Sequence, residues 1–136
     1  MALPNGSGGY QVGSGNNSET ILSYAAVPQT ATDTATLTAA QIVGGILVAT
    51  PTANATLTLP TAALIDAAVP SARVGSTFDL SFVNAAAATY TAAFAVSGAT
   101  GVTNGGNGIT SVAAASSALF RFRKTGDAAW TVYKIA

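Results

Sequence analysis

Hydrophobic and polar residues alternate along much of the chain, and this period-two pattern predicts β-strands. It is clearest in STFDLSFV, where the side chains of Phe78, Leu80 and Phe82 share one face and polar side chains share the other. ATLTLP has the same alternation, with Leu57 and Leu59 on its apolar face. Both segments are therefore predicted to be strands with one face towards a core.

Further segments extend this pattern towards both ends of the chain. GILVAT is apolar on both faces and is predicted to be a buried strand. TYTAAFAV repeats the alternation, and ITSVAAASSALFRFR is predicted to be extended with a break near residues 114–116. TGDAA then closes a hairpin to WTVYKI, whereas VTNGGNG is predicted to be a loop because its glycines accept positive φ angles.

One segment, TAALIDAAVP, favours a helix over a strand. Thr61 is expected to cap its first turn, since a threonine hydroxyl accepts a hydrogen bond from a free backbone N–H. Leu64, Ile65 and Ala68 would form its apolar face, and a proline ends it. A helical turn is also predicted over residues 39–43, closed by two glycines.

Seven or eight short strands with glycine-rich turns predict an all-β fold. We expect an antiparallel β-sandwich or jelly-roll-like barrel with one short helix, formed by residues 31–136. The length of 136 residues fits one such domain.

Residues 1–30 are predicted to form an extended, flexible N-terminal arm. They are rich in Gly, Ser and Asn and have too few apolar side chains to form a core. One interpretation is a tail without structure. The other is an arm that becomes ordered on a partner, with Tyr10, Val12, Ile21, Leu22 and Tyr24 as its anchors.

The segment LFRFRKTGDAAWTVYKI carries four of the five basic residues and the single tryptophan. Two phenylalanines alternate there with Arg121 and Arg123, so the arginines are predicted to face away from the core. They have two interpretations. Either they lie on a solvated strand face or pair across strands with Asp79 and Asp127, or they form a docking patch for an acidic partner, since guanidinium groups bind carboxylates bidentately.

The last strand has two apolar faces. Trp130 and Val132 share one face, and Tyr133 and Ile135 share the other with a threonine. A strand of this kind has to be covered on both sides. Either the N-terminal arm covers the second face or another subunit does, and we favour a subunit interface that includes Tyr133 and Ile135.

Charge is scarce, which changes the expected class of partner. Only 7% of residues are charged and the net charge is zero, whereas about 25% are charged in typical soluble domains. Nucleic-acid binding draws most of its affinity from Lys and Arg, so no nucleic-acid partner is expected. The longest apolar run spans residues 42–49, far short of the roughly 20 residues of a membrane span, so no membrane partner is expected.

The residue inventory favours a structural or interaction protein over an enzyme. Without His or Cys, a Ser-His-Asp or Cys-His arrangement is impossible and zinc loses its commonest ligands. The acids are too widely spaced for a calcium loop, and neither glycine cluster completes a phosphate-binding motif. We therefore expect no catalytic site, no metal site and no cofactor.

From Leu57 onwards the sequence resembles a family of small virion proteins of tailed phages, especially marine and cyanobacterial ones. The resemblance is carried by TLTLPTAALIDAAVPSARVGSTFDLSFVNAAAATYT, GVTNGGNGITSVAAASSALFRFRKTG and the final AWTVYKI. It covers roughly residues 33–136, and the N-terminal arm lies outside it.

The resemblance implies a capsid decoration (cement) protein. Such proteins are β-rich homotrimers on the outer surface of the expanded head, where they bridge neighbouring major capsid subunits. On this basis the N-terminal arm would contact the capsid. Two other roles remain open, a tail-fibre or spike module that binds a host receptor, and a cellular adhesion or surface-layer module.

Overall fold

The computed structural model describes residues 24–106 and 111–136, and within them the fold is rich in β-structure with two short helices. The elements are β1 (Gln29–Ala31), β2 (Ala35–Thr36), α1 (Ala39–Val43), β3 (Ile46–Ala49), β4 (Ala55–Thr58), α2 (Ala62–Ala68), β5 (Thr77–Asn84), β6 (Ala92–Ala95), β7 (Val102–Asn104), β8 (Ser116–Gly126) and β9 (Ala129–Lys134). The prediction of a β-rich fold is confirmed. The predicted loop VTNGGNG is wrong in part, because its first residues form β7.

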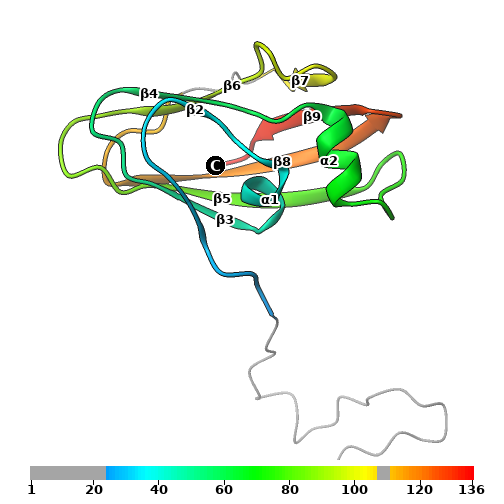
Figure 1. Cartoon of the computed structure of the whole chain (residues 1–136), viewed down its shortest axis with the longest axis horizontal. Coiled ribbons are helices and arrows are strands. Elements are labelled where there is room, and N and C mark those ends of the chain that lie inside the picture. The colour runs from blue at the N-terminus through cyan, green and yellow to red at the C-terminus, as the bar shows by residue number, and fades with distance from the viewer. Residues whose placement is uncertain (1–23, 107–110) are drawn as a thin grey trace, which may run out of the picture.

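The strands form two sheets, and the chain crosses between them repeatedly (Figure 1). The six-stranded sheet has the order β1-β3-β5-β8-β9-β7, and the three-stranded sheet has the order β2-β4-β6. From β1 to β6, consecutive strands alternate between the two sheets. The chain therefore makes three windings, β1–β2, β3–β4 and β5–β6, stacked side by side.

This winding explains why the expected antiparallel pairing is mostly wrong. Five of the seven strand pairs are parallel, and only β5–β8 and β8–β9 are antiparallel. Adjacent antiparallel strands need only a tight turn, whereas parallel neighbours need a crossover connection. Here the crossover of each winding is a strand of the other sheet, so short strands with short connections still pair in parallel.

Side chains in the turns hold successive windings in register. The Asp33 carboxylate accepts hydrogen bonds from the backbone N–H of Thr52 at 2.8 Å and from its hydroxyl at 3.0 Å. In the next pair of windings, Asn54 Oδ1 accepts a bond from the backbone N–H of Thr91 at 3.0 Å. Each bond joins one winding to the equivalent turn of the next and satisfies a backbone donor outside the strands.

Both helices follow strands of the three-stranded sheet, and their caps differ from the prediction. Thr38 and Gln41 form a capping box at α1 that was not predicted from the sequence. Gln41 Nε2 also donates to Thr30 O at 2.8 Å, so α1 protects the edge strand β1. Thr61 is the N-cap residue of α2 but makes no side-chain capping bond, so the predicted Thr61 cap is wrong.

The apolar face of α2 is also rotated from the prediction. Ala62 and Ile65 are buried, whereas Leu64 is 55% exposed and Ala68 lies at the surface. The backbone N–H of Ala62 donates to Thr100 O at 2.9 Å, which fixes the start of the helix against the turn before β7. This contact turns Ile65 inward and leaves Leu64 outside.

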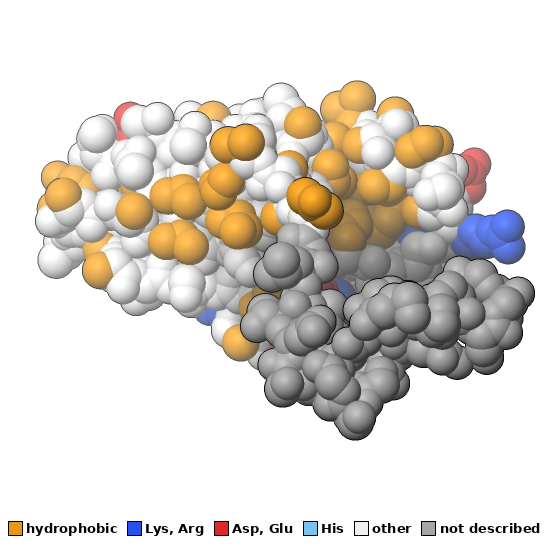
Figure 2. All heavy atoms as spheres, turned by 90° about the horizontal axis from the view of Figure 1, so that it is seen from below, with side chains coloured by type: hydrophobic (Ala, Val, Ile, Leu, Met, Phe, Trp, Pro, Cys, Tyr) orange, Lys and Arg blue, Asp and Glu red, His pale blue; other side chains and the backbone are white. Residues whose placement is uncertain are grey.

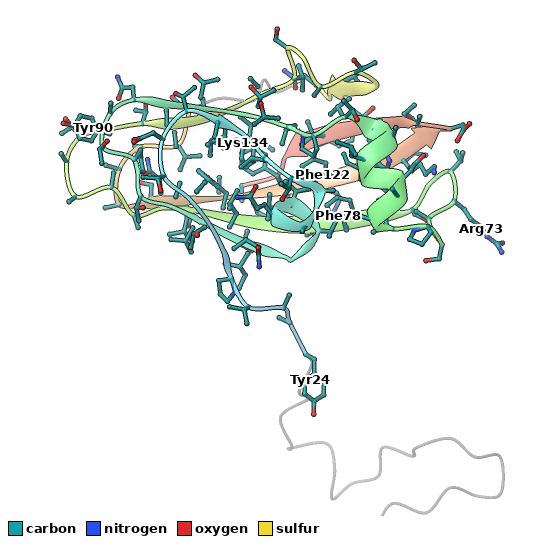
Figure 3. The ribbon with its side chains drawn as sticks, in the orientation of Figure 1. Tyr24, Arg73, Phe78, Tyr90, Phe122 and Lys134 are labelled. Carbon is teal, nitrogen blue, oxygen red and sulfur yellow. The ribbon has the colours of Figure 1, made fainter. Side chains whose placement is uncertain are left out.

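Aromatic side chains from the long central strands fill the core. Phe78 and Phe122 stack with ring centroids 4.8 Å apart and a 5° interplanar angle, and Figure 3 shows both near α2. The ring centroid of Phe94, in the three-stranded sheet, lies 4.7 Å from that of Phe120 and 4.9 Å from that of Phe82, both in the six-stranded sheet. One hydrophobic cluster therefore joins the two sheets.

Asn84, at the end of β5, is the one fully buried polar side chain among the described residues. Its Nδ2 donates to Tyr90 O and Val112 O, both at 2.9 Å, and its Oδ1 accepts from Ala86 N at 3.1 Å. It thereby joins β5, the following loop and the segment before β8. Asn84 continues the inward-facing positions of Leu80 and Phe82 along β5, but the alternation does not reveal these partners.

Asn84→Ala is expected to lower the free energy of unfolding by about 2 kcal/mol, because the backbone N–H of Ala86 and the carbonyl of Tyr90 lose the hydrogen bonds to Asn84. Denaturant titration at constant slope measures the loss. Asn54→Ala is the matched control, since Asn54 also reaches this loop but is exposed. Equal losses in both variants would contradict the role assigned to Asn84.

Candidate functional site

Acidic and basic side chains are few, and most of those in the part of the chain that the structure describes lie apart from one another. Residues 24–106 and 111–136 contain no cluster of three or more His, Cys, Asp or Glu side chains that could hold a metal ion. Over the same residues no helix is long and apolar enough to cross a membrane. A charge network, a pocket and two surfaces stand out among the described residues.

The charge network lies where α2 meets the β8–β9 hairpin. Asp66 Oδ1 accepts hydrogen bonds from Lys124 Nζ and from Trp130 Nε1, both at 2.7 Å. Asp66 Oδ2 accepts a bond from the backbone N–H of Ala128 at 3.0 Å. One carboxylate thus joins a helix to both strands of the hairpin and to its turn, where Ala128 has a φ of 44°.

This environment favours the ionised form of Asp66. The hydrogen bond from Lys124 lowers the pKa of the Asp66 carboxyl below its ordinary value, and the Trp130 and Ala128 donors lower it further. Partial burial opposes this shift but does not outweigh it. The hydrogen bonds of this network all lie within the chain, so we interpret it as a structural clamp.

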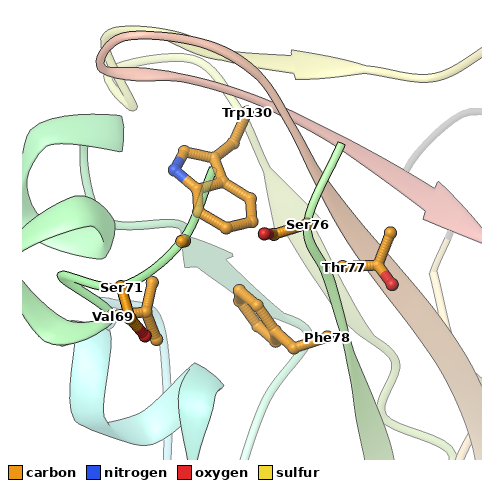
Figure 4. Close-up of a pocket in the computed structure, with 7 residues that line it drawn as sticks. Val69, Ser71, Ser76, Thr77, Phe78 and Trp130 are labelled. Atoms are coloured by element: carbon orange, nitrogen blue, oxygen red, sulfur yellow. The ribbon is translucent and has the colours of Figure 1, made fainter. Parts of the chain in front are cut away.

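A pocket of about 210 Å³ lies next to this network, between the end of α2 and the start of β5 (Figure 4). Its lining residues are Val69, Ser71, Ala72, Ser76, Thr77, Phe78 and Trp130. Two aromatic rings and small hydroxyl side chains therefore share one hollow. The sequence did not predict this pocket, because residues 69–76 form a loop without a periodic pattern of apolar positions.

The two arginines predicted to form a docking patch differ in their partners. Arg121 Nε and Nη2 donate to the two carboxylate oxygens of Asp79 at 2.7 and 2.8 Å, which confirms the predicted cross-strand pair with Asp79. Arg121 lowers the pKa of Asp79, and Asp79 raises that of Arg121. Arg123 lies opposite Thr77 and Thr131, which are uncharged.

The outer face of the six-stranded sheet carries the residues predicted to form a subunit interface. Tyr133 is half-buried, with its ring lying against Gly105, and Ile135 is 52% exposed. β9 is an inner strand, because β7 pairs with it on the side away from β8. Half-buried apolar side chains also lie on this face at Ile46, Val48, Val83 and Leu119.

The anchors predicted for the N-terminal arm are divided by the limits of the structure. Tyr10, Val12, Ile21 and Leu22 lie outside the described residues. Tyr24 is fully exposed and, as Figure 3 shows, lies well away from the sheets. Val27 is 78% exposed on the same segment, so two apolar side chains before β1 have no contact that would bury them among the described residues.

No match was found among protein-family models, curated proteins or solved structures.

Proposed function

We propose that this chain is a structural virion protein that decorates and stabilises the expanded phage capsid, bridging neighbouring major capsid subunits as a trimer. The observation that carries this proposal is the sequence pattern from Leu57 to the C-terminus, which resembles small phage virion proteins. In this role the chain would act by non-covalent contacts on the outer surface of the head. It would need no cofactor and no catalytic group.

The character of the surface supports an interaction role. Figure 2 shows a face with few charged side chains, on which hydrophobic side chains are spread among uncharged ones. A surface with so few charges provides little electrostatic repulsion between protein molecules, so it does little to prevent their association. The outer face of the six-stranded sheet, with Tyr133 and Ile135, is our proposed trimer interface, and the N-terminal arm is our proposed contact with the capsid.

Many weak contacts repeated over a lattice suit this role. An arm that becomes ordered on its partner loses conformational entropy for each copy bound. In a trimer three arms bind together, so the effective concentration of the second and third arms is high. Avidity then compensates for weak single contacts.

The alternative of a tail-fibre or spike module that binds a host receptor has less support. A glycan-binding surface usually offers an exposed aromatic ring for stacking. Trp130, the only tryptophan, is 1% exposed and hydrogen-bonded to Asp66. Its indole is part of the core and of the Asp66 network.

Deleting residues 1–25 is expected to abolish binding to expanded heads while the trimer stays intact. The deletion ends before β1 begins at Gln29, so it removes no strand or helix that the structure describes. Co-sedimentation with heads that lack the protein measures binding, and light scattering measures the trimer. Heads that bind the shortened chain normally would contradict the role of the arm.

A further inference from the structure

The end of β7 carries a chemically reactive pair of residues, Asn104 and Gly105. Among the residues that the structure describes, Asn104 is the only asparagine followed by a glycine. Asparagine is one of the thermally labile residues of proteins. A following glycine makes it most reactive, because no side chain hinders the backbone nitrogen from closing a ring onto the asparagine amide. The end of β7 therefore has the chemistry of a modification site.

The packing of Tyr133 requires the glycine of this pair. The backbone of Gly105 lies against the Tyr133 ring, and a Cβ at this position would collide with that ring. Glycine is the residue that allows such a close approach of the backbone to a neighbour. A glycine is thus kept next to Asn104 by the packing of β9, and the reactive pair follows from it.

The nitrogen that would attack is held in the strand ladder. The backbone N–H of Gly105 donates to Val132 O at 2.8 Å, and this bond is the last rung between β7 and β9. Before it can attack, the nitrogen has to lose its proton and turn towards the Asn104 side chain. The rung opposes both steps, so the pairing of β7 with β9 protects the site.

The side chain that would be attacked is accessible and already bent over the following backbone. Asn104 is exposed, and its Oδ1 accepts a hydrogen bond from the N–H of Gly106 at 3.3 Å. This bond holds the side-chain amide over the turn and draws electron density from its carbonyl carbon. The electrophile is thus in place, whereas the nucleophile is restrained.

β7 is the strand of the six-stranded sheet that we expect to open most readily. It has three residues and lies at the edge of the sheet, where β9 is its neighbour (Figure 1). Two of the three, Thr103 and Asn104, are exposed. Segments with few buried contacts open locally at a lower free energy than the whole fold. Local opening of β7 is therefore enough to release the Gly105 nitrogen.

We propose that Asn104 is a deamidation site that the β7–β9 pairing holds closed, so that it reacts when β7 leaves the sheet. The Gly105 nitrogen loses its proton and forms a bond with Asn104 Cγ. The side-chain nitrogen takes up a proton and leaves as ammonia. Water then opens the cyclic imide at either carbonyl and gives aspartate or isoaspartate. The reaction needs water and no cofactor.

The product would be a lasting record that β7 has opened. Both products carry a new carboxylate in a chain whose formal net charge is zero. Isoaspartate also adds a methylene group to the main chain, so Thr103 and Gly105 lose their common register on β9. This inference concerns the chemical ageing of the fold. It goes beyond the proposed function and does not depend on it.

Incubation of the full chain at mildly alkaline pH tests the proposal. Peptide mapping with tandem mass spectrometry measures conversion at Asn104 separately from Asn107, which also precedes a glycine. Conversion of Asn104 in the folded chain should be at least about tenfold slower than in the chain unfolded by guanidinium chloride. This ratio corresponds to a free energy of opening of about 1.4 kcal/mol or more.

Thr103→Ala separates local opening of β7 from global unfolding. The Thr103 and Thr131 hydroxyls lie 2.9 Å apart and join β7 to β9. The variant should therefore convert Asn104 about two- to fivefold faster than the wild type, as expected from the loss of a cross-strand Thr–Thr pair. Thr56→Ala is the matched control, because Thr56 is exposed on β4 in the other sheet. This control should react at the wild-type rate.

Three results would overturn the proposal: equal rates in the folded and unfolded chain, no conversion of Asn104 in the unfolded chain, or equal rates in the two threonine variants. Circular dichroism shows that each variant is folded when tested. Because this experiment uses no capsid, its outcome is separate from that of the head-binding experiment.

Discussion

Phe122→Ala is expected to lower the free energy of unfolding by about 3–5 kcal/mol, the range seen when a buried aromatic side chain is truncated. Phe122 is fully buried on the central strand β8 and stacks on Phe78. Typical domains have a free energy of unfolding of about 5–15 kcal/mol. The variant should therefore lose a large share of its stability, as measured by denaturant or thermal unfolding.

Leu64→Ala is the control for this prediction. Both changes remove a large apolar side chain, but Leu64 is 55% exposed on α2. Leu64→Ala should change the free energy of unfolding by no more than about 0.5 kcal/mol, as for most surface substitutions. A Phe122→Ala variant as stable as Leu64→Ala would show that β8 is not the centre of the core.

Asp66→Asn is expected to lower the free energy of unfolding by about 3 kcal/mol. The change keeps the shape of the side chain but leaves the ammonium group of Lys124 without a counter-charge. Removing one partner of a buried ion pair typically costs 3–5 kcal/mol. The low end applies here, because the side chains of Lys124 and Asp66 remain 11% and 19% exposed.

Asp79→Asn is the matched control, because it breaks an ion pair of equal length at the surface. The side chains of Arg121 and Asp79 are 47% and 39% exposed, and exposed pairs contribute about 0–1 kcal/mol. Unfolding measurements should therefore show a clearly larger loss of stability for Asp66→Asn than for Asp79→Asn. Equal losses would contradict the clamp role of Asp66.

The same network predicts how stability depends on pH. The pKa of Asp66 is lower in the folded chain than its ordinary value of 3.8. Its contribution to stability is therefore complete above the unfolded pKa and is lost as the pH falls through the folded one. We expect wild-type stability to decline below about pH 4 and Asp66→Asn to decline less, as measured by Trp130 fluorescence during denaturation.

Local patterns in the sequence predicted the local structure well. The STFDLSFV segment forms β5, with Leu80 and Phe82 buried and Asp79 and Ser81 exposed. The expected break near residues 114–116 is present, since Ala115 has a φ of 53° and β8 begins at the next residue. A strand's alternation depends only on its own residues, so it can be read without knowing its neighbours.

Strand pairing could not be read in this way. The parallel pairing of β1, β3 and β5 depends on each intervening strand joining a second sheet. Nothing in the alternation of β3 or β4 states which sheet it joins. The rotation of α2 has a similar origin, because the contact of Ala62 with Thr100 is made far along the chain.

The site was predicted only in part for the same reason. The pairing of Arg121 with Asp79 was predicted from their opposite charges at outward-facing strand positions, without knowledge of which strands are neighbours. The Asp66 network could not, since Lys124 and Trp130 are 58 and 64 residues away from Asp66. The pocket depends on that network and on a loop without periodicity, so only the three-dimensional structure revealed it.

The copy number of this chain in purified virions tests the proposed function most directly. Quantitative mass spectrometry measures this copy number relative to that of the major capsid protein. A trimer at each local three-fold axis predicts about one copy per capsid subunit. A few copies per virion, or none, would contradict a role as a protein that covers and staples the capsid lattice.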